Sequence, residues 1–170
     1  MLNILLVGNN LKELSQISSY LKEQFGTLAL HICSEQEEVI EMAYEKLPEV
    51  ILLEFSFNNN KGPDFCNLLK NKSITSHIPI VLISEALTTP EERIKGLLAG
   101  ADSFISKPID KAEVLAVINV MLRVKAAEDE LRRQNQELAQ KVAQTSQELS
   151  FKQKRYADMF DAAANIIILI

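Results

Sequence analysis

Long apolar runs are missing from this 170-residue sequence, and cysteine is scarce. No stretch approaches the ~18 consecutive apolar residues that a membrane-spanning helix needs, and the first residues lead us to expect no leader of signal-peptide type. The two cysteines, Cys33 and Cys66, lie far apart in apolar surroundings, which is typical of buried thiols in a reducing compartment rather than of a disulfide. We therefore expect a soluble, cytoplasmic chain with no membrane segment.

The few histidines and glycines exclude further kinds of site. His31 and His77 have no second histidine or carboxylate at metal-ligand spacing, so we expect no metal centre and no cofactor there. Gly8 lacks the following glycines of a dinucleotide fingerprint, and Gly96 and Gly100 are too sparse for a phosphate-binding loop. A net charge of −5 and the absence of a helix-turn-helix reader argue against nucleic acid as a partner.

Short apolar segments alternate with amphipathic ones over the first 122 residues. The segment Val50–Glu54 follows Pro48 and carries four branched apolar residues in a row, which is typical of a strand buried on both faces. Such alternation predicts an α/β fold, a flavodoxin-like doubly wound parallel sheet of five strands in the order 2-1-3-4-5. The expected strands are residues 3–7, 28–33, 50–54, 78–84 and 103–106.

Helix boundaries are indicated by capping residues. Ser34 with Glu37, and Thr89 with Glu92, have the spacing of capping boxes. Gly26 is expected to stop the helix that begins at Leu11, Gly100 to end the fourth helix, and Asp110 to cap a helix that begins at Lys111.

Five polar or small residues fall at the ends of expected strands: Gly8, Asn9, Glu54, Ser84 and Lys107. In a parallel sheet, ligands and chemistry lie beyond the carboxyl ends of the strands, so these residues are expected to converge on one edge. A carboxylate such as Glu54 at the end of a buried central strand is costly to place there. We therefore take this edge as the candidate site.

The last helix has no glycine or proline from Asp110 to about Ala163, and the charge balance changes along it. Residues 1–122 hold 10 basic and 16 acidic side chains, whereas residues 123–157 hold 8 and 5. An imperfect heptad pattern starts with Met121 at position a, and Asn135 at an a position favours a two-stranded, in-register pairing. We expect a coiled coil that forms a parallel homodimer, with the seam Leu131, Asn135, Leu138, Val142 and Leu149.

The first 122 residues resemble the receiver domains of two-component response regulators. The matching marks are Ser84 at the end of the fourth strand, the run Gly100-Ala101-Asp102, Phe104, Lys107-Pro108, and Gly62 eight residues after Glu54. The resemblance implies a receiver fold, with Ser84, Phe104 and Lys107 as retained switch residues. It also implies partners among other two-component signalling proteins.

The sequence departs from the family pattern at the positions that the resemblance assigns to phosphoryl transfer. The resemblance implies an acceptor aspartate and an acidic pair that holds a divalent cation. Here Glu54 stands at the acceptor position, and Gly8 and Asn9 stand at the acidic pair. Mg²⁺ prefers carboxylate oxygens, so tight binding is not expected. Two interpretations of Glu54 stay open. It either reaches Lys107 and holds the domain in one state, as a phosphorylated aspartate would, or it pairs with Lys107 only to satisfy two partly buried charges.

We therefore expect a pseudo-receiver without catalytic or metal-binding residues of its own, which acts by protein contact and dimerisation. Two alternatives stay open: a phosphorylatable receiver that accepts a phosphoryl group from a histidine kinase, and a receiver-like domain that binds a small ligand. Residues Arg155–Ile170 resemble the start of a PAS sensory domain, with a strand expected at Asn165–Ile170. The expected division is a receiver-like domain (1–122), a coiled-coil linker (123–157) and a truncated PAS-like start (158–170). Such an arrangement resembles part of a hybrid histidine kinase or a cyclic-dinucleotide enzyme.

Overall fold

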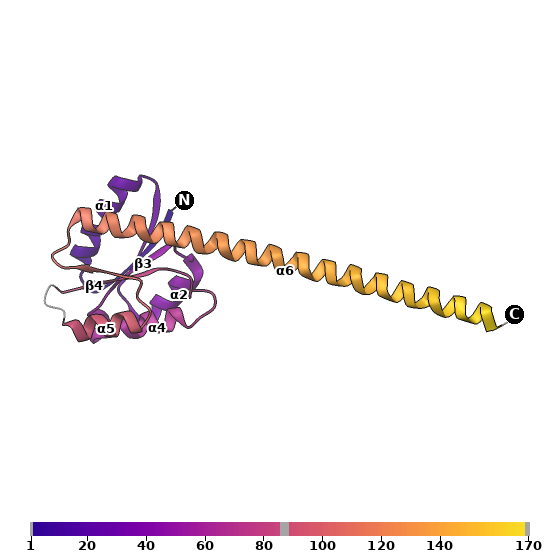
Figure 1. Cartoon of the computed structure of the whole chain (residues 1–170). Coiled ribbons are helices and arrows are strands. Elements are labelled where there is room, and N and C mark those ends of the chain that lie inside the picture. The colour runs from indigo at the N-terminus through magenta and orange to yellow at the C-terminus, as the bar shows by residue number, and fades with distance from the viewer. Residues whose placement is uncertain (1, 86–88, 169–170) are drawn as a thin grey trace. The chain divides into compact units, whose positions relative to one another are not determined.

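The computed structural model describes residues 2–85 and 89–168, and the chain divides into two compact units, Met1–Glu128 and Asp129–Ile170. The first unit contains one parallel five-stranded sheet in the order β2-β1-β3-β4-β5 (Figure 1). The predicted flavodoxin-like fold is therefore confirmed. The strands are β1 (Leu2–Val7), β2 (Leu28–Cys33), β3 (Val50–Glu54), β4 (Ile80–Ser84) and β5 (Ser103–Ser106).

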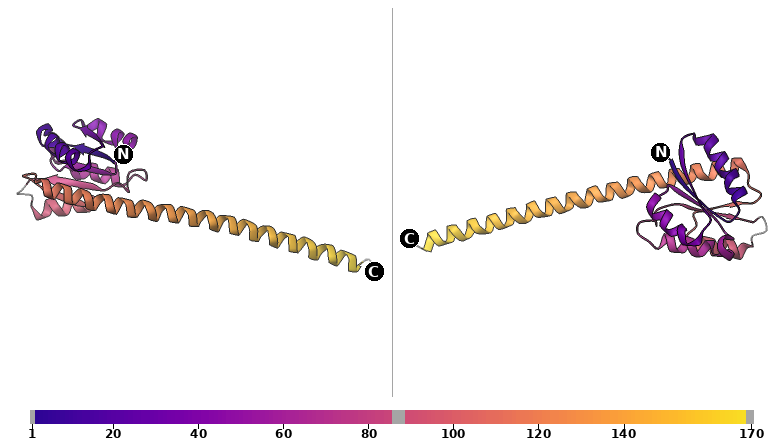
Figure 2. Two further views of the ribbon diagram at one scale, coloured as in Figure 1. Left: turned by 90° about the horizontal axis from the view of Figure 1, so that it is seen from above. Right: turned by 180° about the vertical axis from the view of Figure 1, so that it is seen from behind.

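The helices lie on both faces of this sheet. They are α1 (Leu11–Phe25), α2 (Gln36–Lys46), α3 (Phe57–Asn60), α4 (Gly62–Lys70), α5 (Pro90–Leu98) and α6 (Lys111–Ile168). Figures 1 and 2 show α1 and the beginning of α6 on one face, with α2, α4 and α5 on the other. The one-turn helix α3, which the sequence did not predict, contains Asn58 and Asn59 in left-handed conformations.

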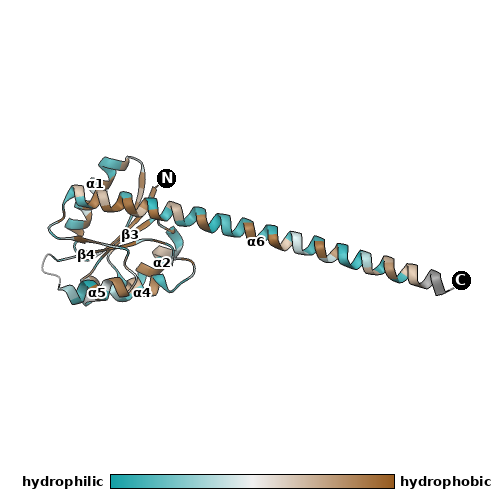
Figure 3. Cartoon of the chain, in the orientation of Figure 1, coloured by the Kyte–Doolittle hydropathy of each residue, from teal (hydrophilic) through white to brown (hydrophobic). Residues whose placement is uncertain are grey.

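Each face of the sheet has its own core. Leu14 and Ile17 of α1 pack with Ile118 of α6 on one face, whereas Val39 of α2 and Leu69 of α4 belong to the core on the other. All five residues of the central strand β3 are buried, as its run of branched apolar residues predicts. In Figure 3 the strands are correspondingly hydrophobic. Two buried faces leave the strand ends as the place where a polar site can form.

Most of the predicted helix boundaries are confirmed. Thr89 accepts a hydrogen bond from the Glu92 amide, and the Glu92 side chain accepts one from the Thr89 amide. The Asp110 side chain accepts from the Glu113 amide at 2.9 Å. Gly26 follows α1 with a φ of +65°, and α5 ends at Leu98, shortly before Gly100, whose φ is +98°. Left-handed backbone of this kind strongly favours glycine.

The capping box predicted at Ser34 and Glu37 is wrong. Helix α2 begins at Gln36 with Glu35 as its N-cap residue, and the Glu35 side chain makes no capping hydrogen bond. The reason is local: the chain leaves β2 in an extended conformation that continues through Glu35, with a φ of −103° and a ψ of +131°. The first helical residue therefore falls too late for Ser34 to reach the first turn.

Helix α6 is buried at its start and exposed further along. Val114, Ile118 and Met121 lie in the core, but every side chain from Ala126 to Ala164 is exposed. Along this stretch, hydrophobic and hydrophilic bands alternate in Figure 3. Across residues 2–85 and 89–168, no helix is long and apolar enough to cross a membrane.

The strand predicted at Asn165–Ile170 is wrong from Asn165 to Ile168, which continue α6; Leu169 and Ile170 lie outside the described residues. A short apolar run is ambiguous between strand and helix, and extending an existing helix needs no new nucleus. The resemblance of this segment to a PAS domain stays a prediction.

Candidate functional site at the strand ends

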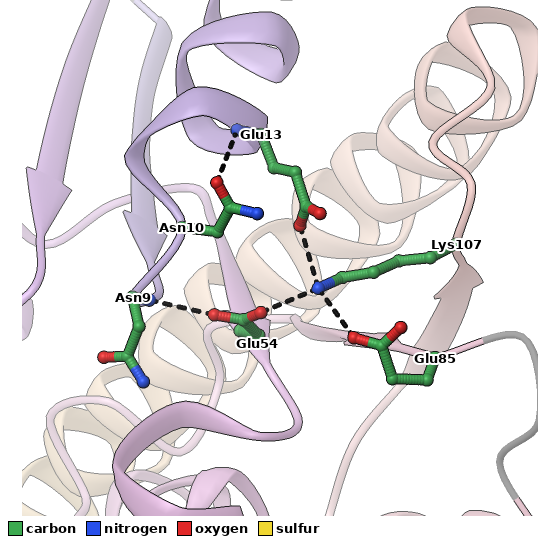
Figure 4. A network of polar contacts seen from close by, with 6 residues as sticks. All are labelled: Asn9, Asn10, Glu13, Glu54, Glu85 and Lys107. Carbon is green, nitrogen blue, oxygen red and sulfur yellow. Dashed lines mark hydrogen bonds and ion pairs between the residues drawn. The ribbon is translucent and has the colours of Figure 1, made fainter.

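Glu54, the last residue of β3, lies at the centre of the candidate site and is 6% exposed. One of its oxygens, Oε2, accepts a hydrogen bond from the backbone amide of Asn9 at 2.9 Å. The other, Oε1, lies 2.8 Å from the Lys107 ammonium (Figure 4). Both carboxylate oxygens are thus held by groups that follow strands on either side of β3 in the sheet, Asn9 after the adjacent β1 and Lys107 after β5, the next strand beyond β4.

Lys107 contacts three carboxylates at once. Its Nζ lies 2.8 Å from Glu54, 2.8 Å from Glu13 and 2.9 Å from Glu85, and the Lys107 side chain is 12% exposed (Figure 4). Its backbone amide also donates to the carbonyl oxygen of Ser84 at 2.8 Å, which fixes the start of the side chain at the sheet edge. One positive charge therefore connects α1, the end of β3 and the residue after β4.

The ionisation of Glu54 and Lys107 is mutually supported. Burial works to raise the pKa of Glu54, but the hydrogen bonds from Lys107 and the Asn9 amide outweigh it, so that pKa lies below its ordinary value. Desolvation likewise works to lower the pKa of Lys107, and the hydrogen bonds to Glu13, Glu54 and Glu85 raise it above the ordinary value. Both groups are charged at neutral pH.

Two glycines allow the backbone to approach Glu54 closely. A Cβ at Gly8 would lie 2.9 Å from Glu54 Oε2, and a Cβ at Gly62 would lie 2.6 Å from the carbonyl oxygen of Glu54. At residue 62 the contact is with fixed backbone, so a side chain there would force the main chain to move. At residue 8 the contact is with the end of the Glu54 side chain, so a side chain there would have to displace the Glu54 carboxylate from its hydrogen bonds.

Ser84 and Phe104 do not join the Glu54 network. Ser84 is 1% exposed, and within the described part of the chain its Oγ has no hydrogen-bond partner. Phe104 of β5 packs against the core on the α2, α4 and α5 face of the sheet, and the guanidinium carbon of Arg93 lies 5.1 Å from its ring centroid. The structure therefore brings together Gly8, Asn9, Glu54 and Lys107, and leaves the serine hydroxyl unengaged.

Two residues of the site were missed by the sequence analysis. Glu13 lies in the first turn of α1, where Asn10 caps the helix by accepting from the Glu13 amide. Glu85 directly follows Ser84. Both residues could have been predicted from the sequence. Glu13 lies in the first turn of the helix that follows β1, and Glu85 directly follows β4, so both are expected beside the same edge of the sheet.

A scan of the sequence matches residues 4–119 to the family model of the response regulator receiver domain. The chain belongs to the response regulator receiver family. The match covers more than half of the chain and includes the five strands and the Glu54 network at their ends, which we call the crevice below.

Curated relatives of this receiver are longer proteins. The chain is 42% identical over 91 residues to the response regulator PleD of Caulobacter vibrioides, which is 54% of this chain and 20% of that protein. It is 33% identical over 87 residues to the phosphate regulon transcriptional regulatory protein PhoB of Escherichia coli, or 51% of this chain and 38% of that protein. The aligned part thus spans less than half of either relative.

Solved structures with low sequence identity share the receiver fold. A putative response regulator from Chloroflexus aurantiacus superposes with a TM-score of 0.66 at 18% identity, over 71% of this chain and 97% of that one. The receiver domain of a signal transduction histidine kinase from Syntrophus aciditrophicus gives a TM-score of 0.62 at 21% identity, over 72% and 91%.

The divalent cation that the receiver resemblance implies does not fit the residues present. Gly8 and Asn9 offer no carboxylate, and the Glu54 oxygens are held by an ammonium and an amide. Across residues 2–85 and 89–168, no group of three or more histidine, cysteine, aspartate or glutamate side chains could hold a metal ion. The positive charge among the carboxylates of this crevice comes from Lys107.

Proposed function

We propose that this receiver is a pseudo-receiver: a module of a two-component signalling protein that works without phosphorylation. The observation that carries the proposal is the closed network around Glu54, in which Lys107 and the Asn9 amide occupy both carboxylate oxygens. Phosphoryl transfer to an acid depends on positioning and on a cation that offsets charge. Here the acid is already paired, and the residues that would hold a cation are missing.

The length of Glu54 supports the same conclusion. Glutamate places its carboxylate one methylene further from β3 than aspartate does, and displacement near 1 Å can cost about 100-fold in rate. The extra methylene is accommodated because Gly8 has no side chain in its path. The site thus accommodates the ion pair between Glu54 and Lys107 rather than a reacting phosphoryl group.

Glu54 is better described as a partner of Lys107 than as an imitation of a phosphorylated aspartate. An imitation would also engage the hydroxyl that the resemblance assigns to phosphoryl recognition, yet Ser84 Oγ has no partner among the described residues. We expect Glu54→Ala and Glu54→Gln to leave the dimer mass unchanged in light scattering. A shift to monomer in both variants would favour imitation.

Intact mass spectrometry tests the absence of phosphorylation. The chain is incubated with a small acyl phosphate donor and millimolar Mg²⁺, and we expect no gain of one phosphoryl group. The matched control is the triple variant Gly8→Asp, Asn9→Asp, Glu54→Asp, which restores the family pattern and is used once circular dichroism shows it folded. A phosphoryl gain by the unaltered chain would establish the alternative, a working phosphoacceptor.

The output is proposed to pass through α6. Its apolar side chains Leu131, Leu138, Val142 and Leu149 are between 55% and 64% exposed, an arrangement that a second copy of the chain would bury. Arg133 pairs with Glu130 and Glu137 on the outer side of the helix and leaves the apolar stripe open. Light scattering tests the homodimer directly, and a monomer at micromolar concentration would remove this part of the proposal.

A second candidate function is recognition of a small polar ligand beside the crevice. A pocket of about 330 Å³ lies next to the Glu54 network, and amides contribute much of its lining. Thermal-shift screening of nucleotides, amino acids and sugars would identify such a ligand. The lining residues are Asn9, Ser34, Glu35, Gln36, Glu37, Phe57, Asn58 and Asn59.

The parent protein is proposed to be a multidomain signalling protein, such as a hybrid histidine kinase or a cyclic-dinucleotide enzyme. This proposal rests on the length of the curated relatives, of which the alignment with this chain covers 20% to 38% in the two described above. Sequencing the parent gene around this segment tests it.

A further inference from the structure

The exposed part of α6 carries an apolar seam interrupted by four polar residues. We define the seam as the a and d positions of the heptad pattern from Val124 to Tyr156. The polar positions are Glu128 and Asn135 at a, and Thr145 and Lys152 at d. The inference below rests on the proposed dimer. The polar positions of the seam decide whether the two copies run parallel or antiparallel.

A parallel, in-register dimer places each seam residue against itself. Asn135 would then face Asn135 of the second copy, which is favourable, and this is the basis of the sequence-based expectation. However, Glu128 would face Glu128 of the second copy, and Lys152 would face Lys152 of the second copy. Two layers of the parallel seam would therefore hold like charges across the interface, which weakens pairing.

An antiparallel dimer instead places a positions of one copy against d positions of the other. When the two-fold axis passes residue 140, Glu128 meets Lys152 of the second copy and Asn135 meets Thr145 of the second copy. The apolar layers match as well, because Leu131 meets Leu149 of the second copy and Leu138 meets Val142 of the second copy. We infer that α6 forms an antiparallel homodimer centred on residue 140.

Neighbouring antiparallel registers do not match. A shift of one heptad in one direction places Asn135 against Leu138 of the second copy, and a shift in the other places Glu128 against Met159 of the second copy. Each buries a polar group against an apolar one, which costs free energy without a compensating hydrogen bond. Only the register centred on residue 140 joins polar layers to polar layers and apolar layers to apolar layers.

The outer positions are compatible with this arrangement. The ion pairs of Arg133 with Glu130 and Glu137 lie at c and f positions, away from the seam. Lys141 flanks the axis and faces its own equivalent, but exposed like charges of this kind repel weakly in water. The overlap from Val124 to Tyr156 is about 48 Å long at 1.5 Å per residue.

The inference has a functional consequence. Val124, which belongs to the receiver unit of one copy, meets Tyr156 of the second copy in the outermost layer. Through this contact, a conformational change at the receiver reaches the partner's downstream segment as well as its own, which α6 joins directly. Signalling in this dimer would act between copies.

Cysteine cross-linking of the full 170-residue chain distinguishes the orientations. Asn135→Cys carrying an affinity tag is mixed with untagged Thr145→Cys under mild oxidation, with the unaltered chain as the control for Cys33 and Cys66, which are both buried. We expect a disulfide between the two different chains and little between identical Asn135→Cys chains. Cross-linking of Asn135→Cys to itself, or a dimer that forms neither disulfide, overturns the inference. A monomer in light scattering instead removes the proposed dimer itself.

Charge exchange gives an independent readout. In the antiparallel seam, Glu128→Lys alone or Lys152→Glu alone creates like-charge layers, so we expect each to raise the dimer Kd on the order of tenfold. The double exchange restores both pairs and should restore the Kd. In a parallel seam the single exchanges only replace one like-charge layer with another. Unchanged Kd values in both single variants would therefore contradict the antiparallel arrangement.

Discussion

Gly8, which follows β1, lies directly beside the side chain of Glu54 at the end of the adjacent strand β3. A Cβ built on Gly8 would lie 2.9 Å from Glu54 Oε2 and 3.2 Å from Glu54 Cβ, both closer than side chains normally pack. The missing side chain at residue 8 thus makes room for the longer acid at residue 54. Residues 8 and 54 are thus in direct contact, and a change in the size of one side chain affects the space left for the other.

Gly8→Ala is expected to destabilise the chain by about 1–3 kcal/mol, because the added methyl overpacks the Glu54 carboxylate. The backbone at Gly8 does not have a positive φ, so strain in the main chain adds nothing. Chemical denaturation measures the loss. The matched control repeats Gly8→Ala in a Glu54→Ala background, where the cost should largely disappear; equal costs in both backgrounds would show that the two residues do not interact.

Lys107→Met should destabilise the chain by about 3 kcal/mol or more, because it leaves a buried carboxylate without its cation. The companion variant Glu54→Gln, Lys107→Met removes both charges of the buried pair and should recover part of the loss. Lys46→Met is a surface control: Lys46 lies 3.4 Å from Glu45 in an exposed pair, and such pairs contribute about 0–1 kcal/mol. Similar losses for Lys107→Met and Lys46→Met in urea denaturation would refute the buried network.

The stability contribution of Glu54 is expected to depend on pH in a defined direction. Because its pKa in the folded chain lies below the ordinary value of 4.5, its contribution is full above about pH 4.5 and is lost as pH falls through the lower, folded-state pKa. The pKa of Lys107 is raised from 10.5, so its contribution is full below that value and is lost only as pH rises beyond it.

The difference in unfolding free energy between the unaltered chain and Glu54→Gln should therefore be largest between these two values and shrink toward acid pH. Urea denaturation over a pH series measures it. Glu45→Gln, at an exposed pair, serves as the control for general acid effects. A difference that stays constant down to pH 3 would mean that Glu54 is not stabilised in its charged form.

Gly96→Ala is expected to displace the Phe104 ring. A Cβ at Gly96 would lie 2.6 Å from Phe104 Cζ and 2.8 Å from Leu82 Cδ1, so the ring must move or the chain must lose about 1–3 kcal/mol. Aromatic proton shifts in NMR spectra report the ring, and denaturation reports the loss. Combining Gly96→Ala with Phe104→Leu should cost less than the two separate losses added together; strict additivity would contradict the close contact.

Much of the fold follows from local pattern. Four branched apolar residues in β3 predict a strand buried on both faces, and the residues Thr89, Glu92 and Asp110 predict caps that the structure shows. These features can be predicted from the sequence because each depends only on residues a few positions away in the chain. The strand expected at residues 165–170 is wrong over residues 165–168 for the complementary reason, since a short apolar run can continue the element that precedes it.

The sequence by itself determined which residues meet at the crevice, because parallel strands bring their carboxyl ends to one edge and so place Gly8, Asn9, Glu54 and Lys107 together. Only the tertiary structure decided which of their side chains contact one another and which further residues join them. Glu13 and Glu85 converge on one ammonium, and the Ser84 hydroxyl is buried without a partner in the part of the chain that the structure describes; both depend on side-chain directions across four separate elements. Such directions are set by packing among residues distant in sequence, which no local pattern encodes.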